Sequence, residues 1–192
     1  MLKPNCYIIA GPNGSGKTTF ATDFLPDFAE CRNFVNPDLF AKAFSPFFPD
    51  SAMLKAAKET LKAIDENIRT KRDFAFETTL SGRAYAGTIQ RIRDAGFVVT
   101  MFYLWLPTSS LSIQRIKSRV RHGGHNVPEN DVLRRFDRTR INLFTLYRPL
   151  LDNLYFFDNS ADSPRLVFTD TNGEVSIQDA QLYTYLIKDF PQ

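Results

Sequence analysis

The chain alternates short apolar runs with longer amphipathic segments. The apolar runs are bounded by glycine, proline or polar residues, which is typical of buried β-strands. The longest run, Phe97–Leu106, is continuous and ends at Pro107. The predicted strands are Cys6–Ala10, Asn33–Asn36, Phe74–Phe76, Phe97–Leu106 and Leu154–Phe157, and Arg165–Thr169 and Glu174–Ile177 flank the turn 171–173 as a hairpin.

Between these runs, apolar residues recur with the period of a helix. Leu54, Leu61, Ile64 and Ile68 follow this spacing within one long segment. The predicted helices are Lys17–Leu25, Leu39–Phe44, Ala52–Thr70, Ala84–Ala95, Leu111–Val120, Glu129–Tyr147 and Asp179–Asp189. Alternating strands and helices predict an α/β fold with a mostly parallel sheet flanked by helices on both faces. Ligands of such sheets bind at the carboxyl ends of the strands.

Composition fits one soluble domain, residues 1–192. The chain is 43% hydrophobic and contains 18 Phe, many of which we expect in the core. Cys6 and Cys31 are isolated and lack metal-ligand or disulfide-framework spacing, and Cys6 is expected to be a small buried hydrophobe. No apolar run approaches a membrane span, and the N-terminus carries no signal-peptide pattern. We therefore expect a cytoplasmic protein that does not interact with membranes.

The segment Gly11-Pro12-Asn13-Gly14-Ser15-Gly16-Lys17-Thr18 matches the phosphate-binding P-loop motif, between a predicted strand and a predicted helix. Glycines allow backbone N–H groups to surround a phosphate, and the helix N-terminus adds its dipole. Lys17 is expected to reach the β- and γ-phosphates of ATP, and the Thr18 hydroxyl to ligate Mg²⁺. Thr19, the next residue, is also expected to contribute to nucleotide binding. The fold expected is therefore that of a P-loop NTPase, but the motif alone does not separate kinases from ATPases, GTPases or motors.

Two further segments resemble nucleotide-binding motifs. Thr70-Lys71-Arg72-Asp73 resembles a guanine-specificity motif, but it precedes a strand and is expected to cap that junction. Leu154–Asp158 resembles a Walker B strand, which motivates an alternative function as an ATPase or switch module acting on a protein partner. A strand ending in a turn at 158–160 explains the same residues.

Two acids follow predicted strands at the ligand edge of the sheet. Asp38 comes after the second strand, where a kinase needs a carboxylate to accept the proton of the attacking hydroxyl. The same residue type favours a helix N-cap, and Asp38 is expected to serve as either or both. Glu77 and Thr78 end the third strand, where they are expected to bind a sugar or to hold Mg²⁺ through water. The alternative is a capping cluster for the next helix.

Positive charge is concentrated in residues 115–140. Eight Arg and Lys residues and three acids give this segment a charge of +5, whereas the whole chain carries +3. Arginine forks match phosphate oxygens, so the segment is expected to form a lid around Gly123-Gly124. A nucleic-acid-end kinase is the rival interpretation. The segment lacks regularly interleaved aromatic residues, so nucleic acid is not the expected partner.

The ordered motifs together resemble the zeta toxin family, in its stand-alone chromosomal branch. They are the P-loop through Thr19, Asn36-Pro37-Asp38, Phe76-Glu77-Thr78-Thr79-Leu80-Ser81, Gly123-Gly124-His125-Asn126-Val127-Pro128 and Asp158-Asn159-Ser160.

The resemblance implies a kinase-like P-loop fold. It also implies an enzyme that uses ATP and Mg²⁺ to phosphorylate a hydroxyl of a nucleotide sugar, typically UDP-N-acetylglucosamine. It implies Asp38 as general base, Glu77 as a sugar-nucleotide contact, and Arg121 with Arg134 or Arg135 as phosphate clamps. Thr78 and Arg119 are further substrate-binding candidates. The resemblance does not identify acceptor residues within 83–95. It leaves open an antitoxin acting in trans and a non-toxic metabolic kinase.

Overall fold

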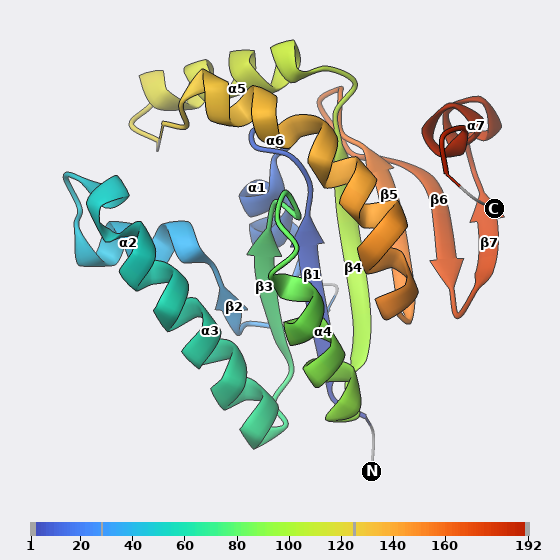
Figure 1. The fold of residues 1–192 in the computed structure, drawn as a ribbon, viewed down its shortest axis with the longest axis horizontal. Helices are drawn as coiled ribbons and strands as arrows, with labels where there is room; N and C mark the ends of the chain where they lie inside the picture. Colours follow the sequence, from blue (N-terminus) through green and yellow to red (C-terminus); the bar gives the residue numbers. More distant parts are fainter. Residues whose placement is uncertain (1–2, 28, 125, 191–192) are drawn as a thin grey trace.

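A seven-stranded sheet forms the centre of the molecule in the computed structural model, which describes residues 3–27, 29–124 and 126–190 (Figure 1). The strand order is β2-β3-β1-β4-β5-β6-β7. The first five strands in this order run parallel, and β6 and β7 join the edge as an antiparallel hairpin. The strands are β1 Asn5–Ala10, β2 Phe34–Val35, β3 Phe74–Thr78, β4 Val98–Trp105, β5 Asn153–Asp158, β6 Arg165–Thr171 and β7 Glu174–Ile177.

Alternation along the central strands sends side chains into two separate cores. In β1, Cys6 and Ile8 belong to the larger core and Ile9 to the smaller one. In β4, six consecutive residues are buried, because helices cover both faces of the sheet there. Both faces being covered explains why the sequence shows continuous apolar runs instead of alternating ones.

The helices cover the two faces unequally. The larger core receives Ile64 from α3, Ile89 from α4 and Leu186 from α7, whereas α1 supplies Ala21 to the smaller core on the opposite face. Figure 1 shows α3, α4 and α6 in front of the sheet and α1 behind it. The helices are α1 Lys17–Phe24, α2 Pro37–Phe44, α3 Met53–Thr70, α4 Tyr85–Asp94, α5 Ser109–Arg121, α6 Glu129–Asn142 and α7 Ala180–Ile187.

The observed architecture confirms the predicted α/β fold with a mostly parallel sheet. The longest predicted strand is the longest observed one, β4, and Cys6 is fully buried as expected. One helix was predicted too long: α6 ends at Asn142, and the chain continues as a π-helical turn, Leu143–Tyr147. The apolar period does not distinguish a π-helical turn from a continuing α-helix, so this change was not visible in the sequence.

The second helix corrects another expectation. Asp38 is not its N-cap, because α2 begins at Pro37 and its cap is Asn36. The Asn36 side chain accepts hydrogen bonds from the backbone N–H groups of Asp38 and Leu39. Pro37 fits the first helical position, where its fixed φ suits the helix and its missing N–H is not needed. Asp38 thus occupies the first turn with its carboxylate available for other contacts.

Helices α5 and α6 form the predicted lid over one end of the sheet (Figure 1). They pack together through Ile116, Val127 and Val132. His125, part of the loop between them, lies outside the described residues. Among the helices of the described segments, none combines the length and the apolar character needed to cross a membrane.

Candidate functional site

The P-loop lies where β1 ends and α1 begins, at the carboxyl edge of the sheet. Gly16, the residue before α1, has φ 84°, and a Cβ there would lie 2.8 Å from the Asn159 side chain. Gly11 has φ 143°, and a Cβ on it would collide with the carbonyl oxygen of Leu104. Both positions therefore require glycine, because of conformation and of space. The loop therefore passes close to its neighbours.

Three side chains brace the P-loop from outside it. Ser112 of α5 donates to the Asn13 carbonyl, and Asn159 Nδ2 donates to the Ser15 carbonyl at 2.7 Å. Arg115 of α5 donates to the carbonyl of Asn159 at 2.7 Å and to those of the next two residues. We call Ser112, Arg115 and Asn159 the P-loop brace. It joins the lid helix α5, the loop after β5 and the P-loop into one unit.

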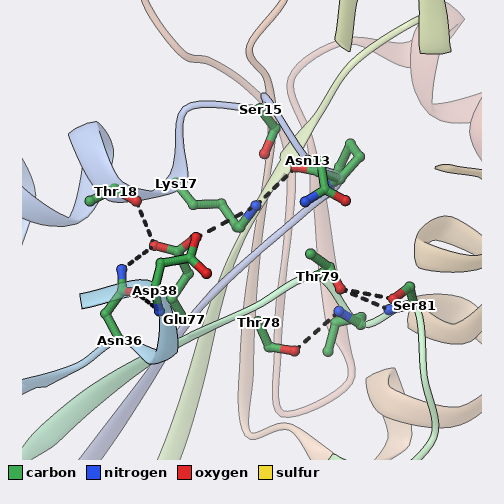
Figure 2. Close-up of polar contacts among 12 residues, drawn as sticks. Asn13, Ser15, Lys17, Thr18, Asn36, Asp38, Glu77, Thr78, Thr79 and Ser81 are labelled. Atoms are coloured by element: carbon green, nitrogen blue, oxygen red, sulfur yellow. Dashed lines mark hydrogen bonds and ion pairs between the residues drawn. The ribbon is translucent and has the colours of Figure 1, made fainter. Parts of the chain in front are cut away.

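Lys17, Thr18 and Glu77 converge at the mouth of the loop (Figure 2). Lys17 Nζ donates to the Pro12 carbonyl at 2.9 Å and lies 3.8 Å from Glu77 Oε1. Thr18 Oγ1 donates to Glu77 Oε2 at 2.8 Å. Burial lowers the pKa of the Lys17 amine, and the carboxylates of Glu77 and Asp38 oppose that effect. The ammonium is thus held in a poorly solvated place, where it interacts strongly with anions.

These residues fit a bound phosphate chain with Mg²⁺. Asn13 Oδ1 and Ser15 Oγ are buried within the loop and have no hydrogen-bond partner among the described residues. Orphaned polar atoms inside a glycine-rich loop, beside a buried lysine, indicate a loop built around a polar ligand. Thr18 donates its proton to Glu77, so its oxygen retains lone pairs for a hard cation, which prefers oxygen ligands. Bound Mg²⁺ would screen phosphate charge.

Asp38 faces the P-loop from α2. Its carboxylate raises the pKa of Lys17, so the two charged groups lie close enough to interact. The side chain of Asp38 is exposed, and it lines a cavity that Lys17 and Thr18 also line. An exposed carboxylate beside the P-loop lysine can accept the proton of a hydroxyl bound in that cavity.

A cavity of about 820 Å³ joins the P-loop to this acid. Of the residues predicted from sequence, the structure brings Gly14, Gly16, Lys17, Thr18, Thr19, Asp38, Glu77 and Arg119 to its lining. Pro46, Phe47 and Phe48 also line this cavity, as does Lys42. The cavity is therefore lined both by P-loop residues and by aromatic rings.

Several predicted residues lie away from this cavity. Arg134 and Arg135 both bind the Asp131 carboxylate on their own helix, at 2.7 Å and 3.1 Å. The hydrogen bond from Arg134 is the main reason that the pKa of Asp131 lies below its usual value. Arg121 is an exposed residue at the end of α5. Thr78 is buried, and its hydroxyl accepts a hydrogen bond from the Leu80 N–H at 3.2 Å. Thr78 thus shapes the following turn.

The two motif-like segments have structural partners. Asp158 accepts from the Ser160 N–H at 3.0 Å and pairs with Arg165 at 3.2 Å, as in the strand-and-turn interpretation. Lys71 ends α3 in the left-handed conformation, and Asp73 accepts from the Asn5 N–H at 2.8 Å. Both acids thus serve local structure.

Sequence reasoning assigned no individual role to Asn36, Asn159 or Arg115. Each makes at least one hydrogen bond to a distant part of the chain. Asn36 and Asn159 are part of the motifs that carry the family resemblance, which was the available signal. Arg115 was counted among the lid arginines, yet its guanidinium donates to backbone carbonyls.

A P-loop at the carboxyl edge of a parallel sheet, facing an acid beneath a helical lid, defines a P-loop nucleotide-binding protein of the kinase-like fold. The zeta toxin family model matches residues 2–179, so the chain belongs to the zeta toxin family. A Haemophilus influenzae protein, described as an uncharacterized protein, is 29% identical over 136 residues, which are 71% of this chain and 95% of that protein.

Solved structures share the fold. Chains in two structures of the AvrRxo1-ORF1:AvrRxo1-ORF2 complex, with sulphate ions and with ATP, match with TM-scores of 0.78 and 0.75. Each is 20% identical, and the match covers 96% of this chain and 63% of theirs, so this chain spans less than two thirds of those relatives. A chain of the PezAT toxin-antitoxin system of Streptococcus pneumoniae matches with a TM-score of 0.69 at 15% identity, over 100% of this chain and 81% of that one.

Proposed function

We propose that the protein is an ATP-dependent phosphotransferase that phosphorylates a hydroxyl of a nucleotide sugar such as UDP-N-acetylglucosamine. The observation that carries the proposal is the shared cavity, in which Lys17 and Thr18 face Asp38. In the reaction, the acceptor oxygen forms a bond to the γ-phosphorus as the bond to the β-phosphate oxygen breaks. Asp38 takes the hydroxyl proton, and ADP leaves.

The residues of the chain divide this work between them. Lys17, the N-terminus of α1 and the P-loop N–H groups bind the phosphates, and Thr18 is the proposed Mg²⁺ ligand. Arg119 reaches the cavity from the lid and is proposed to bind phosphate there. Arg121, Arg134 and Arg135 remain proposed phosphate clamps that need lid movement to reach the site.

A second cavity is proposed to hold the nucleoside of ATP. It measures about 650 Å³ and continues from Gly16 and Thr19 toward Phe157, Asn159 and Pro164. It shares Gly16, Thr19 and Arg115 with the first cavity, so a nucleotide bound across the P-loop would place its base there and its γ-phosphate toward Asp38. The base would pack between apolar groups and Arg115.

The acceptor proposal rests on the chemistry of the first cavity and on the family. Phe47 and Phe48 offer exposed aromatic faces for a planar base, and Lys42 offers charge for a diphosphate. Glu77 is the proposed sugar contact, although its carboxylate is already bonded to Thr18 and Asn36. The alternative function as an ATPase or switch module gains no support from Asp158, which is bonded to Arg165.

The test is incubation of the protein with ATP, Mg²⁺ and a panel of nucleotide sugars, with mass spectrometry of the products. We expect an acceptor that gains one phosphate in step with ADP release, and no product with Asp38→Asn. ATP hydrolysis without a phosphorylated acceptor, stimulated by a protein, would favour the switch module instead. Comparing the nucleotide-sugar pool of cells that express the native protein with that of Lys17→Ala cells extends the test beyond the panel.

We further propose that a partner protein acting in trans controls the activity. The similar chains come from structures of a toxin-antitoxin system and of a two-protein complex. Growth arrest by the native protein, relieved by Lys17→Ala, would support a toxic role. A cytoplasmic location and a single domain spanning 1–192 stay predictions of the sequence.

A further inference from the structure

The side chain of Asn36 lies beside Asp38 and Glu77 in the proposed site, with Glu77 between it and the P-loop residues Thr18 and Lys17 (Figure 2). It is 3% exposed. Its Oδ1 accepts from the N–H of Asp38 at 2.8 Å and from that of Leu39 at 3.2 Å. Backbone N–H groups only donate, so the orientation of the amide is fixed and its Nδ2 must face the other way. There it donates to Glu77 Oε2 at 2.9 Å.

Glu77 extends this connection to the P-loop. The same oxygen, Oε2, accepts from the Thr18 hydroxyl at 2.8 Å. Oε1 lies 3.8 Å from Lys17 Nζ. A continuous path of hydrogen bonds therefore runs from the backbone of Asp38, through Asn36 and Glu77, to the hydroxyl of Thr18. It joins the proposed base to the proposed Mg²⁺ ligand.

The hydrogen-bonded path matters because few backbone hydrogen bonds hold the chain near Asn36. β2 contains two residues and pairs with β3 only through Phe34↔Ala75 and Val35↔Phe76. One position further along, the Asn36 side chain bonds to the Glu77 side chain and continues the connection that the backbone has ended. The beginning of α2 is thus attached to the sheet by a very short edge strand and by this amide.

We propose that Asn36 is a positioning residue that sets Asp38 and the Thr18–Glu77 pair at a fixed separation. The expected effect of Asn36 on catalysis rests on the proposed function. Its expected effect on Mg²⁺-linked ATP binding does not. Without the Nδ2 donor, Glu77 is free to turn, and Thr18 loses the acceptor that keeps its lone pairs toward the cavity. Hydrogen bonds to charged groups of this kind correspond to effects of about tenfold to a hundredfold.

Asn36→Ser separates positioning from helix capping. Serine is an equally favoured N-cap, but its side chain is too short to bring a donor to Glu77. We expect the melting temperature to fall by about 3 to 6 °C, because the buried bond to Glu77 is lost while the N-cap is kept. ATP affinity measured by calorimetry in EDTA should stay native, while the gain in affinity on adding Mg²⁺ falls about tenfold. The kcat for transfer should fall by at least as much, with the acceptor KM little changed.

Asp179→Ser is the matched control. Asp179 caps α7 by accepting from the Leu182 N–H at 2.9 Å, away from the cavity. Serine keeps this cap, so we expect the substitution to lower the melting temperature only through loss of the ion pair between Asp179 and Arg165, at 2.6 Å, and to leave the Mg²⁺ gain native. The proposal is overturned if Asn36→Ser keeps the native Mg²⁺ gain, or if it weakens ATP binding equally with and without Mg²⁺. A native protein that phosphorylates no acceptor refutes the proposed function, whereas the Mg²⁺ gain still decides the role of Asn36.

Exchanging the donor for an acceptor gives a second, independent arm. Asn36→Asp keeps the cap but places a second carboxylate against Glu77, with no proton to donate. We expect Asn36→Asp to lose at least as much of the Mg²⁺ gain as Asn36→Ser does, although its N-cap is kept. An Asn36→Asp variant with the native Mg²⁺ gain would contradict the donor role of the amide.

Discussion

The P-loop and the lid face one cavity but are held in different ways. Lys17 is 6% exposed, and its loop is fixed by hydrogen bonds from α5 and from the loop after β5. Arg134 is 53% exposed and pairs with Asp131 on its own helix. Buried bonds of the first kind are expensive to break, whereas exposed ion pairs contribute about 0 to 1 kcal/mol.

The difference indicates where the protein is preorganised. We propose that the P-loop end of the cavity keeps one geometry, whereas Arg134 and Arg135 of α6 can exchange Asp131 for phosphate at little cost. A preformed donor site with an adaptable lid suits a kinase, because it admits substrates and then surrounds the transferred group. The expected losses should therefore be greatest at the P-loop, smaller across the cavity and smallest where residues only support it.

Lys17→Ala should have the largest effect. Removing the buried ammonium leaves the transferred phosphate without its nearest fixed charge, so transfer should fall by about 10³-fold or more. ATP affinity, measured by calorimetry, should fall with it. The exposed Lys62→Ala is the control and should stay within about twofold of native. Transfer that survives in Lys17→Ala would show that the P-loop is not the donor site.

Asp38→Asn should have the second-largest effect on transfer. The amide keeps size and polarity but cannot accept a proton, so kcat should fall by about 10² to 10⁴ while ATP affinity stays native. Asp65→Asn changes an exposed acid that pairs with Arg91 on the outer surface, and it should leave kcat unchanged. Rapid-quench measurement of the first turnover locates the loss in the chemical step. Unchanged turnover in Asp38→Asn would exclude this residue as the base.

Arg119→Ala tests the lid side of the comparison. Arg119 lines the cavity and lies against Gly124, where a Cβ would collide with its side chain. Loss of one charge-assisted contact to phosphate should raise the KM for ATP about tenfold. Arg121→Ala, Arg134→Ala and Arg135→Ala should each have a smaller effect. If Arg134→Ala or Arg135→Ala costs more, the lid turns α6 toward the phosphates during turnover.

The fold was predictable because its signals are local. Buried strands appear as apolar runs, and the P-loop motif occurred in the strand-and-helix context that it requires. Element ends were harder, as at α2, where Asn36, Pro37 and Asp38 all favour a helix start. The N-cap is decided by which side chain reaches the free N–H groups, and that depends on where β2 ends.

The acceptor side was less predictable because its contacts join distant segments. Asn36 and Glu77 are 41 positions apart, and Asn159 and Ser15 are 144 apart. Nothing in the local pattern around Asn159 indicates that its amide supports a loop at the other end of the chain. Arg115 shows the converse: its charge suggested phosphate, and the sheet topology instead brings it to backbone carbonyls.

Asn159→Ala should give the smallest effect on ATP binding. It should affect both the P-loop and the lid. Asn159 belongs to the P-loop brace, so its loss removes the donor to the Ser15 carbonyl and leaves a buried acceptor unpaired. We expect a decrease of about 1 to 3 kcal/mol in the free energy of unfolding, measured by urea denaturation, and a loss of ATP affinity of only a few fold. The adjacent Ser160→Ala keeps the backbone contacts of that loop and should be near native. A large loss of ATP affinity with native stability would instead mean that Asn159 contacts the nucleotide itself, and the preorganisation of the P-loop would then depend on its ligand.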